Sequence, residues 1–160
     1  MEDRDIRWNN QLETIMAEEG EKARGLAWLH QKAEQETSRK NTRIALPVII
    51  LSTLSGTASV GQEALFGQNN VSSIIIGLVS ISVGILNTIN SYFNYAKRAE
   101  SHRIAHLHYS KLFSWVNVEL SLPRTERIPA EEMLKYLREQ MERLAETSPS
   151  IPPNILEYAP

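Results

Sequence analysis

Two long uncharged stretches in the middle of the chain dominate its pattern of hydrophobic and polar positions. The first covers residues 44–62, the second covers residues 64–96, and only Glu63 separates them. A helix needs about 20 mostly apolar residues to cross the hydrocarbon core of a bilayer. The second stretch exceeds this length, and the first just meets it. The pattern therefore predicts an all-α fold built on a transmembrane helical hairpin, with spans at residues 44–62 and about 71–96.

On both sides of the hairpin the pattern changes to charged helices that carry one apolar stripe. Residues 1–43 repeat apolar side chains at steps of three and four, as an amphipathic helix does. The balance of acids and bases there favours packing against protein over lying on a membrane surface. Residues 97–160 predict a helix that ends at Pro123, a second helix that begins at Pro129, and a proline-rich tail that we expect to be extended. We expect all these parts to form one structural domain. The stripe of the first helix consists of Trp8, Leu12, Ile15, Met16, Ala23, Leu26, Leu29 and Ala33.

The connections between these helices and the two spans are less well defined. If the first membrane helix begins near Pro47, the missing N–H costs nothing at a first helical turn. If the N-terminal helix instead runs straight into the membrane, Pro47 should kink it. No proline follows the second span until Pro123. We therefore expect the second membrane helix to run on into the following segment.

The charges that flank the spans predict their orientation. Three basic residues precede the first span and three follow the second, whereas the link from Glu63 to Asn70 has none. Under the positive-inside rule, both termini are cytoplasmic and the link is external. The chain is thus expected to be an integral membrane protein in contact with the lipid bilayer. The six basic residues are Arg39, Lys40, Arg43, Lys97, Arg98 and Arg103.

Composition removes several classes of function. The net charge is -2, whereas a nucleic-acid partner normally needs a clustered basic face. The chain has no cysteine, so disulfides, thiol nucleophiles and cysteine metal sites are excluded. His102 and His106 have the i, i+4 spacing of two metal ligands, but no third ligand completes a motif, so structural histidines are favoured. A glycine-rich phosphate loop and a nucleophile elbow are also missing. We therefore expect no enzyme, no catalytic residue, no metal and no cofactor.

The second span contains a regular stripe of small and polar residues at alternating steps of four and three. Such spacing places them on one helical face. The face could pack closely against another helix, because small residues let backbones approach. It could instead line a water-filled pore between several subunits. The stripe alone favours packing, but both roles can coexist, because the first span has its own small face. The stripe is Ser73, Gly77, Ser80, Gly84, Asn87 and Ser91, and the small face of the first span is Ser52, Ser55, Gly56 and Ser59.

Two further features bear on the pore interpretation. Neither span contains a charged residue or a histidine, so proton relays and voltage sensors lack their usual side chains. Two helices cannot enclose an aqueous path, so a pore requires a homo-oligomer. In such an oligomer, Lys97 and Arg98 would form a basic ring at the cytoplasmic mouth and would attract anions.

The order of the parts resembles the SLATT superfamily. The resemblance rests on the charged helix with a tryptophan, the hairpin, the segment AKRAESHRIAHLHYSKL, the proline break, the last helix and the SPSIP tail. It implies an oligomeric membrane effector that forms pores and is often coupled to nucleotide-signal sensors in bacterial conflict systems. These 160 residues include no such sensor or nucleotidyltransferase, which leaves open a separate signalling partner or a standalone role. The most specific points are Ala99, His102, Tyr109, Leu112, Pro149, Ile151 and Pro152.

Taken together, residues and resemblance predict a homo-oligomeric membrane channel that passes ions or small solutes. The alternative is a non-conducting structural protein that shapes or anchors a membrane. Its expected partners are lipid and other copies of the chain, and no nucleic acid.

Overall fold

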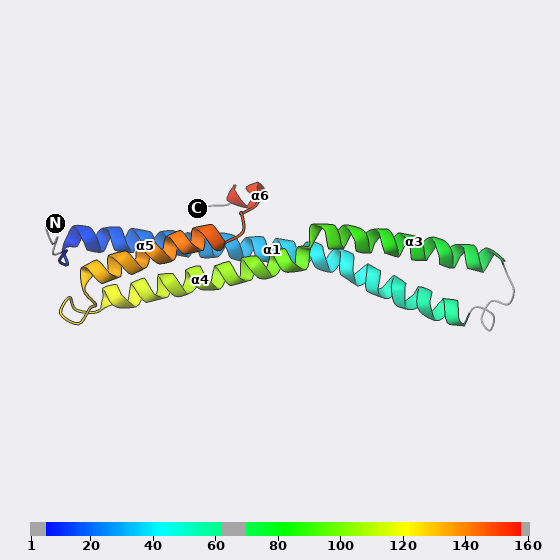
Figure 1. Ribbon diagram of the computed structural model, residues 1–160, viewed down its shortest axis with the longest axis horizontal. Helices are drawn as coiled ribbons and strands as arrows, with labels where there is room; N and C mark the ends of the chain where they lie inside the picture. The colour runs from blue at the N-terminus through cyan, green and yellow to red at the C-terminus, as the bar shows by residue number, and fades with distance from the viewer. Residues whose placement is uncertain (1–5, 62–69, 158–160) are drawn as a thin grey trace. The chain divides into compact units, whose positions relative to one another are not determined.

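The computed structural model describes residues 6–61 and 70–157, and their regular secondary structure is entirely α-helical (Figure 1). The predicted all-α fold is therefore confirmed. Two helical segments, Asn10–Val60 and Asn70–Ser121, each contain an apolar stretch long enough to cross a membrane. The link expected to be external lies outside the described residues except for Asn70. The helices are α1 (Asn10–Val60), α3 (Asn70–Phe93), α4 (Tyr95–Ser121), α5 (Ala130–Thr147) and α6 (Pro153–Leu156).

The chain divides into two compact units. The first unit comprises residues 1–35 and 99–160, and the second comprises residues 36–98. α1 contributes to both units. The hairpin expected at residues 44–96 lies within the second unit. The two flanking stretches, which the sequence presents as separate regions of one domain, together supply the first unit.

The core of the first unit is formed by α1, α4 and α5. The apolar stripe of the N-terminal helix faces this core, as expected for a helix that packs against protein, and Ile15 is its clearest exception at 45% exposed. α1 and α4 approach closely at Gly20, where an added Cβ would lie 3.1 Å from Cγ1 of Val116. The buried core residues are Met16, Ala23, Ala27, Tyr109, Leu112, Val116, Met133, Leu137 and Leu144.

The connection between α4 and α5 contacts Trp8 and the first turn of α1. The indole Nε1 of Trp8 donates a hydrogen bond to the carbonyl of Ile128 over 3.1 Å. The Arg127 guanidinium lies 5.0 Å from the centroid of the Trp8 ring and forms an ion pair with Glu13 at 2.6 Å. Arg124 also pairs with Glu13, at 2.8 Å. These contacts join residues more than 110 positions apart in the sequence.

The C-terminal tail differs from the expected extended segment. Residues Pro153–Leu156 form α6, a single helical turn with a proline in its first turn, where the missing N–H breaks no intrahelical bond. Ile155 is only 3% exposed and packs in a small cluster with Leu29 and Ala33 of α1. The turn is therefore stabilised by burial of one side chain against α1.

The membrane helices also differ from the sequence expectation at their ends. The second one does not run on without interruption, because α3 ends at Phe93 and α4 begins at Tyr95. Asn94 between them has φ 49°, a left-handed conformation that asparagine adopts more readily than most residues. α1, in contrast, continues through Pro47 as a single helix. Pro47 has no N–H to donate to the carbonyl one turn earlier.

Candidate functional site on the membrane hairpin

Within the second unit, the two membrane segments pack as an antiparallel pair through mainly apolar faces. On each helix the half-buried positions recur at steps of three and four, which marks the side turned toward the other helix. A hydrogen bond between the hydroxyls of Ser55 and Ser80, 2.8 Å long, fixes the register of the pair. Within the two spans, the half-buried positions are Ile44, Ala45, Val48, Leu51, Ser55 and Ala58 on α1, and Ser72, Ile76, Val79, Val83, Leu86 and Asn90 on α3.

The predicted stripe on α3 lies beside this packing face. Each stripe residue directly follows a packing residue, and one residue turns a helix by about 100°. All six stripe residues, from Ser73 to Ser91, are exposed in the single chain. Ser80 contacts α1 through its hydrogen bond to Ser55. Gly77, Gly84, Asn87 and Ser91 stay exposed beside the packing face and are therefore available to another partner.

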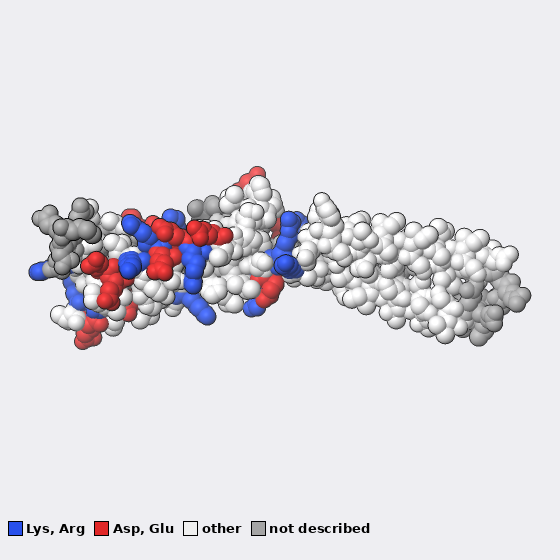
Figure 2. All heavy atoms as spheres, viewed as in Figure 1, with Lys and Arg blue, Asp and Glu red and all other residues white. Residues whose placement is uncertain are grey.

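The third face of α3 is mainly aliphatic. Ile74, Leu78, Ile81 and Ile85 are 57% to 62% exposed and lie away from both the packing face and the stripe. The exposed surface is uncharged throughout residues 44–61 and 70–96, and Figure 2 shows no charged side chain along the visible part of α3. Apolar surface of this extent suits contact with lipid chains.

The small face of the first span lies on the same flank of the hairpin as the α3 stripe. When two antiparallel helices are viewed along one axis, successive residues turn clockwise on one helix and counterclockwise on the other. The residue that directly follows a packing residue therefore lies on the same side of the pair in both helices. Ser52, Gly56 and Ser59 occupy such positions on α1 and are exposed. The Ser55–Ser80 bond joins the two faces at their common edge. Of the four small residues of α1, Ser55 is half-buried and the other three are exposed. We call the combined surface the small-residue flank.

Several hydroxyl groups in the spans bind their own helix. Ser59 donates to the carbonyl of Ser55, and Thr88 donates to that of Gly84, at 2.8 and 2.9 Å. Such bonds satisfy a hydroxyl without a second helix. Asn87 differs, because its exposed side-chain amide has no hydrogen-bond partner among the described residues. An amide whose donors and acceptor lack hydrogen-bond partners in hydrocarbon costs several kcal/mol.

Asn90 is a second polar residue of the span, and the sequence pattern did not identify it as part of a site. It belongs to the half-buried face that packs against α1, and its Oδ1 is buried without a hydrogen-bond partner in the described part of the chain. An unmatched buried acceptor costs about 1–3 kcal/mol. The packing of the pair therefore leaves an unsatisfied acceptor in the span.

The two basic clusters lie at the same end of the hairpin. α1 enters and α3 leaves there, since the pair is antiparallel. Lys97 and Arg98, the residues predicted at a pore mouth, are exposed near the start of α4. Lys40 pairs with Glu36 at 2.9 Å.

The histidines of the first unit form a buried contact that the sequence did not reveal. Nδ1 of His30 on α1 lies 3.0 Å from Nδ1 of His102 on α4, and the two residues are 2% and 4% exposed. The His30 ring stacks on Tyr109 with centroids 5.6 Å apart. Burial, together with the charges of His102 and His106, lowers the pKa of His30 to about 4. His102 and His106, whose spacing along the helix is that of two metal ligands, therefore contact different partners.

His106 directs its Nδ1 to the carbonyl of Ala27 at 3.0 Å, whereas His102 contacts His30. Among the described residues, no group of three or more potential ligands could hold a metal ion. The spacing of histidines along α4 could not identify His30 as the partner of His102, because His30 lies on α1, 72 residues earlier in the sequence.

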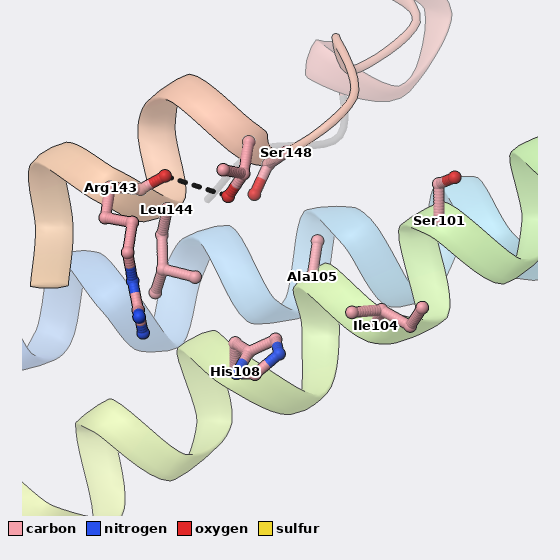
Figure 3. A pocket seen from close by; sticks show the side chains of 8 residues that line it. Ser101, Ile104, Ala105, His108, Arg143, Leu144 and Ser148 are labelled. Atoms are coloured by element: carbon pink, nitrogen blue, oxygen red, sulfur yellow. Dashed lines mark hydrogen bonds between the residues drawn. The ribbon is translucent and has the colours of Figure 1, made fainter.

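His108 lies at a shallow pocket of about 330 Å³ between α4 and α5 (Figure 3). The Arg143 side chain extends from α5 toward α4, and the hydroxyl of Thr147 donates to the Arg143 carbonyl over 2.8 Å. The remaining lining residues are Ser101, Ile104, Ala105, Leu144 and Ser148. The pocket adjoins the C-terminal end of α5, whose carbonyls do not favour an anion.

The fold and the hairpin define an all-α membrane protein with two apolar helices. Residues 28–114, more than half of the chain, match the family model of the SMODS and SLOG-associating 2TM effector domain family 4. The chain belongs to this family, in agreement with the resemblance found in the sequence. Comparison with curated proteins and with solved structures gave no match. The match includes the whole described hairpin and both His30 and His102, and it ends before α5.

Proposed function

We propose that this membrane effector acts as a homo-oligomeric pore for ions or small solutes, with the small-residue flank at the subunit contacts and around the aqueous path. The observation that carries the proposal is the exposed Asn87 amide within this flank. In a single hairpin it would face hydrocarbon without a partner. Water in a pore, or a polar group of a neighbouring subunit, would supply its hydrogen bonds.

The shape of the flank supports assembly of several copies. Gly56, Gly77 and Gly84 have nothing within 4 Å of an added Cβ in the single chain. Glycines at exposed membrane positions allow a neighbouring helix to approach closely. The hairpin is held together by its own apolar faces, so these glycines stay exposed and could contact other copies.

The proposal includes an orientation and a selectivity. The basic end of the hairpin would face the cytoplasm, following the positive-inside rule. Lys97 and Arg98 would then surround the cytoplasmic mouth and favour anions that enter from that side. The effect on the cell would be a change in membrane permeability, and we assign no catalytic residue, cofactor or nucleic-acid partner.

Flux through liposomes that contain the purified full chain tests this proposal. We expect Asn87→Leu to reduce flux at least tenfold while the oligomer persists, because it removes the most polar side chain from the path. Ile85→Leu, on the aliphatic face, is the matched control and should change flux less than twofold. The mass of each variant in mild detergent reports its assembly.

Three outcomes would contradict the proposal or part of it. Dissociation of the oligomer by Asn87→Leu would make the flank a packing face and place any pore elsewhere. A monomer at every protein concentration would exclude both assembly and pore. An assembled chain without flux or conductance steps in several lipids and voltages would favour the non-conducting structural protein.

A further inference from the structure

The flank opposite the small-residue flank carries two arginines at the edge of the membrane segment. Arg39 and Arg43 are four residues apart, so they lie on the same face of α1, one turn from each other. Both are exposed, and neither forms an ion pair with any described residue. The nearest basic neighbour, Lys40, is already paired with Glu36 at 2.9 Å. Two adjacent positive charges destabilise a helix unless an anion lies between them.

Aromatic side chains occur at the same level. Counting outward from the Ser55–Ser80 contact, Arg43 lies about level with Tyr92 on the antiparallel helix. Tyr92 is 83% exposed and Phe93 is 42% exposed. Their rings contact each other edge to face at 5.3 Å, and Phe93 stacks on Tyr95 at 5.4 Å. Aromatic rings of this kind are typical of the boundary between hydrocarbon and headgroups.

The apolar stretches end at this level on both helices. On α1 the uncharged run begins at Ile44, directly after Arg43, and α3 ends at Phe93. The phosphate layer of a bilayer would therefore lie beside the two guanidinium groups. Each guanidinium can donate two parallel hydrogen bonds to phosphate oxygens.

We propose that Arg39 and Arg43, at the membrane level marked by Tyr92 and Phe93, form a site for the headgroup of an anionic phospholipid. The phosphodiester bridges the two guanidinium groups, and its acyl chains descend along the exposed aliphatic surface. The site lies on the flank opposite the proposed pore surface. It requires the hairpin to be in a bilayer, but it does not require the chain to conduct.

Energy transfer to labelled lipids can test the site directly. Because the chain has no cysteine, a donor dye can be attached at Thr42→Cys, an exposed position next to Arg43. Full-length protein is reconstituted into phosphatidylcholine vesicles with a small, equal fraction of headgroup-labelled phosphatidylglycerol or phosphatidylcholine acceptor. An attraction of about 1 kcal/mol per basic residue corresponds to roughly fivefold local enrichment. We expect severalfold enrichment of phosphatidylglycerol over phosphatidylcholine.

Variants separate this site from general attraction to the protein. Arg39→Gln with Arg43→Gln should abolish the enrichment, whereas the same positions changed to lysine should keep most of it. Lys111→Gln with Arg138→Gln, at exposed positions of the first unit, removes the same charge and should leave the enrichment unchanged. The lysine variant also reports whether loss of the guanidinium groups, with the charge kept, affects insertion.

Equal transfer to both lipids in the unmodified sequence would overturn the site. Equal loss in the glutamine variant and in the control variant would do the same. Displacement of the labelled lipid by millimolar inorganic phosphate would show a site for free phosphate instead. A chain that enriches phosphatidylglycerol but fails to conduct would retain this site and refute the proposed pore.

Discussion

At the scale of single residues, the buried contact between His30 and His102 makes the stability of the first unit depend on pH. The pKa of His30 is lowered from 6.5 to about 4, chiefly by burial and then by the neighbouring His102 and His106. The third side chain against it, Tyr109, has a pKa raised by burial and stays neutral in this range. The unfolded chain therefore binds a proton below pH 6.5 that the folded chain excludes.

This difference predicts a loss of stability in mild acid. The contribution of His30 is fully present above pH 6.5 and decreases as the pH falls toward 4, by up to about 3 kcal/mol at 1.4 kcal/mol per pKa unit. Chemical unfolding of the full chain in detergent at pH 7 and pH 5 measures it. His30→Gln should reduce the difference between the two pH values, while His108→Gln, at an exposed position, should preserve it.

Between pH 7 and pH 5, the ionised side chain of Glu13 does not contribute to the expected change in stability. Hydrogen bonds from Arg124 and Arg127 lower the pKa of Glu13 from 4.5 to about 2, so its contribution is lost only below about pH 4.5. An unchanged pH dependence in His30→Gln would therefore assign the effect to other residues and contradict the prediction.

At the scale of an element, the two glycines of α1 in the first unit should respond in opposite directions to alanine. Gly25 has nothing within 4 Å of an added Cβ, so Gly25→Ala should raise the free energy of unfolding by about 0.5–1 kcal/mol through helix propensity. At Gly20 the added Cβ would lie 3.1 Å from Cγ1 of Val116, which is 2% exposed. Overpacking there should outweigh the propensity gain and lower stability by about 1 kcal/mol.

Chemical unfolding of both variants under identical conditions checks this pair. The Val116→Ala background provides the control, because removal of the opposing methyl groups should make Gly20→Ala less harmful. Stabilisation by Gly20→Ala with Val116 intact would show that α1 and α4 can separate at no cost. It would contradict the close packing described above.

At the scale of the whole molecule, the charge distribution predicts the topology. Asn70 begins α3 at the end of the hairpin away from the basic clusters, and Lys111 is exposed on α4. In intact cells, a membrane-impermeant maleimide should label Asn70→Cys and should label Lys111→Cys only after permeabilisation. The cysteine-free chain is the background for both variants. The reverse pattern would invert the orientation and move the proposed pore mouth to the outside.

Sequence pattern alone determined the elements that depend on local composition. Uncharged runs of membrane length, the amphipathic stripe of α1 and the proline boundaries at Pro123 and Pro129 are each set by neighbours along the chain. The predicted stripe of α3 also follows from spacing, because a helix converts steps of three and four into a face. These predictions needed no knowledge of distant contacts.

Tertiary structure decided which surfaces face one another. The stripe on α3 is exposed because apolar residues one position earlier pack against α1, a choice that periodicity could not make. His30 becomes the partner of His102 only when two helices from distant parts of the sequence meet. Asn94 interrupts a run that propensity would continue, and burial of Ile155 stabilises a turn in a proline-rich tail. Pairing, burial and unmet hydrogen bonds depend on distant residues, so they become defined only when the chain folds.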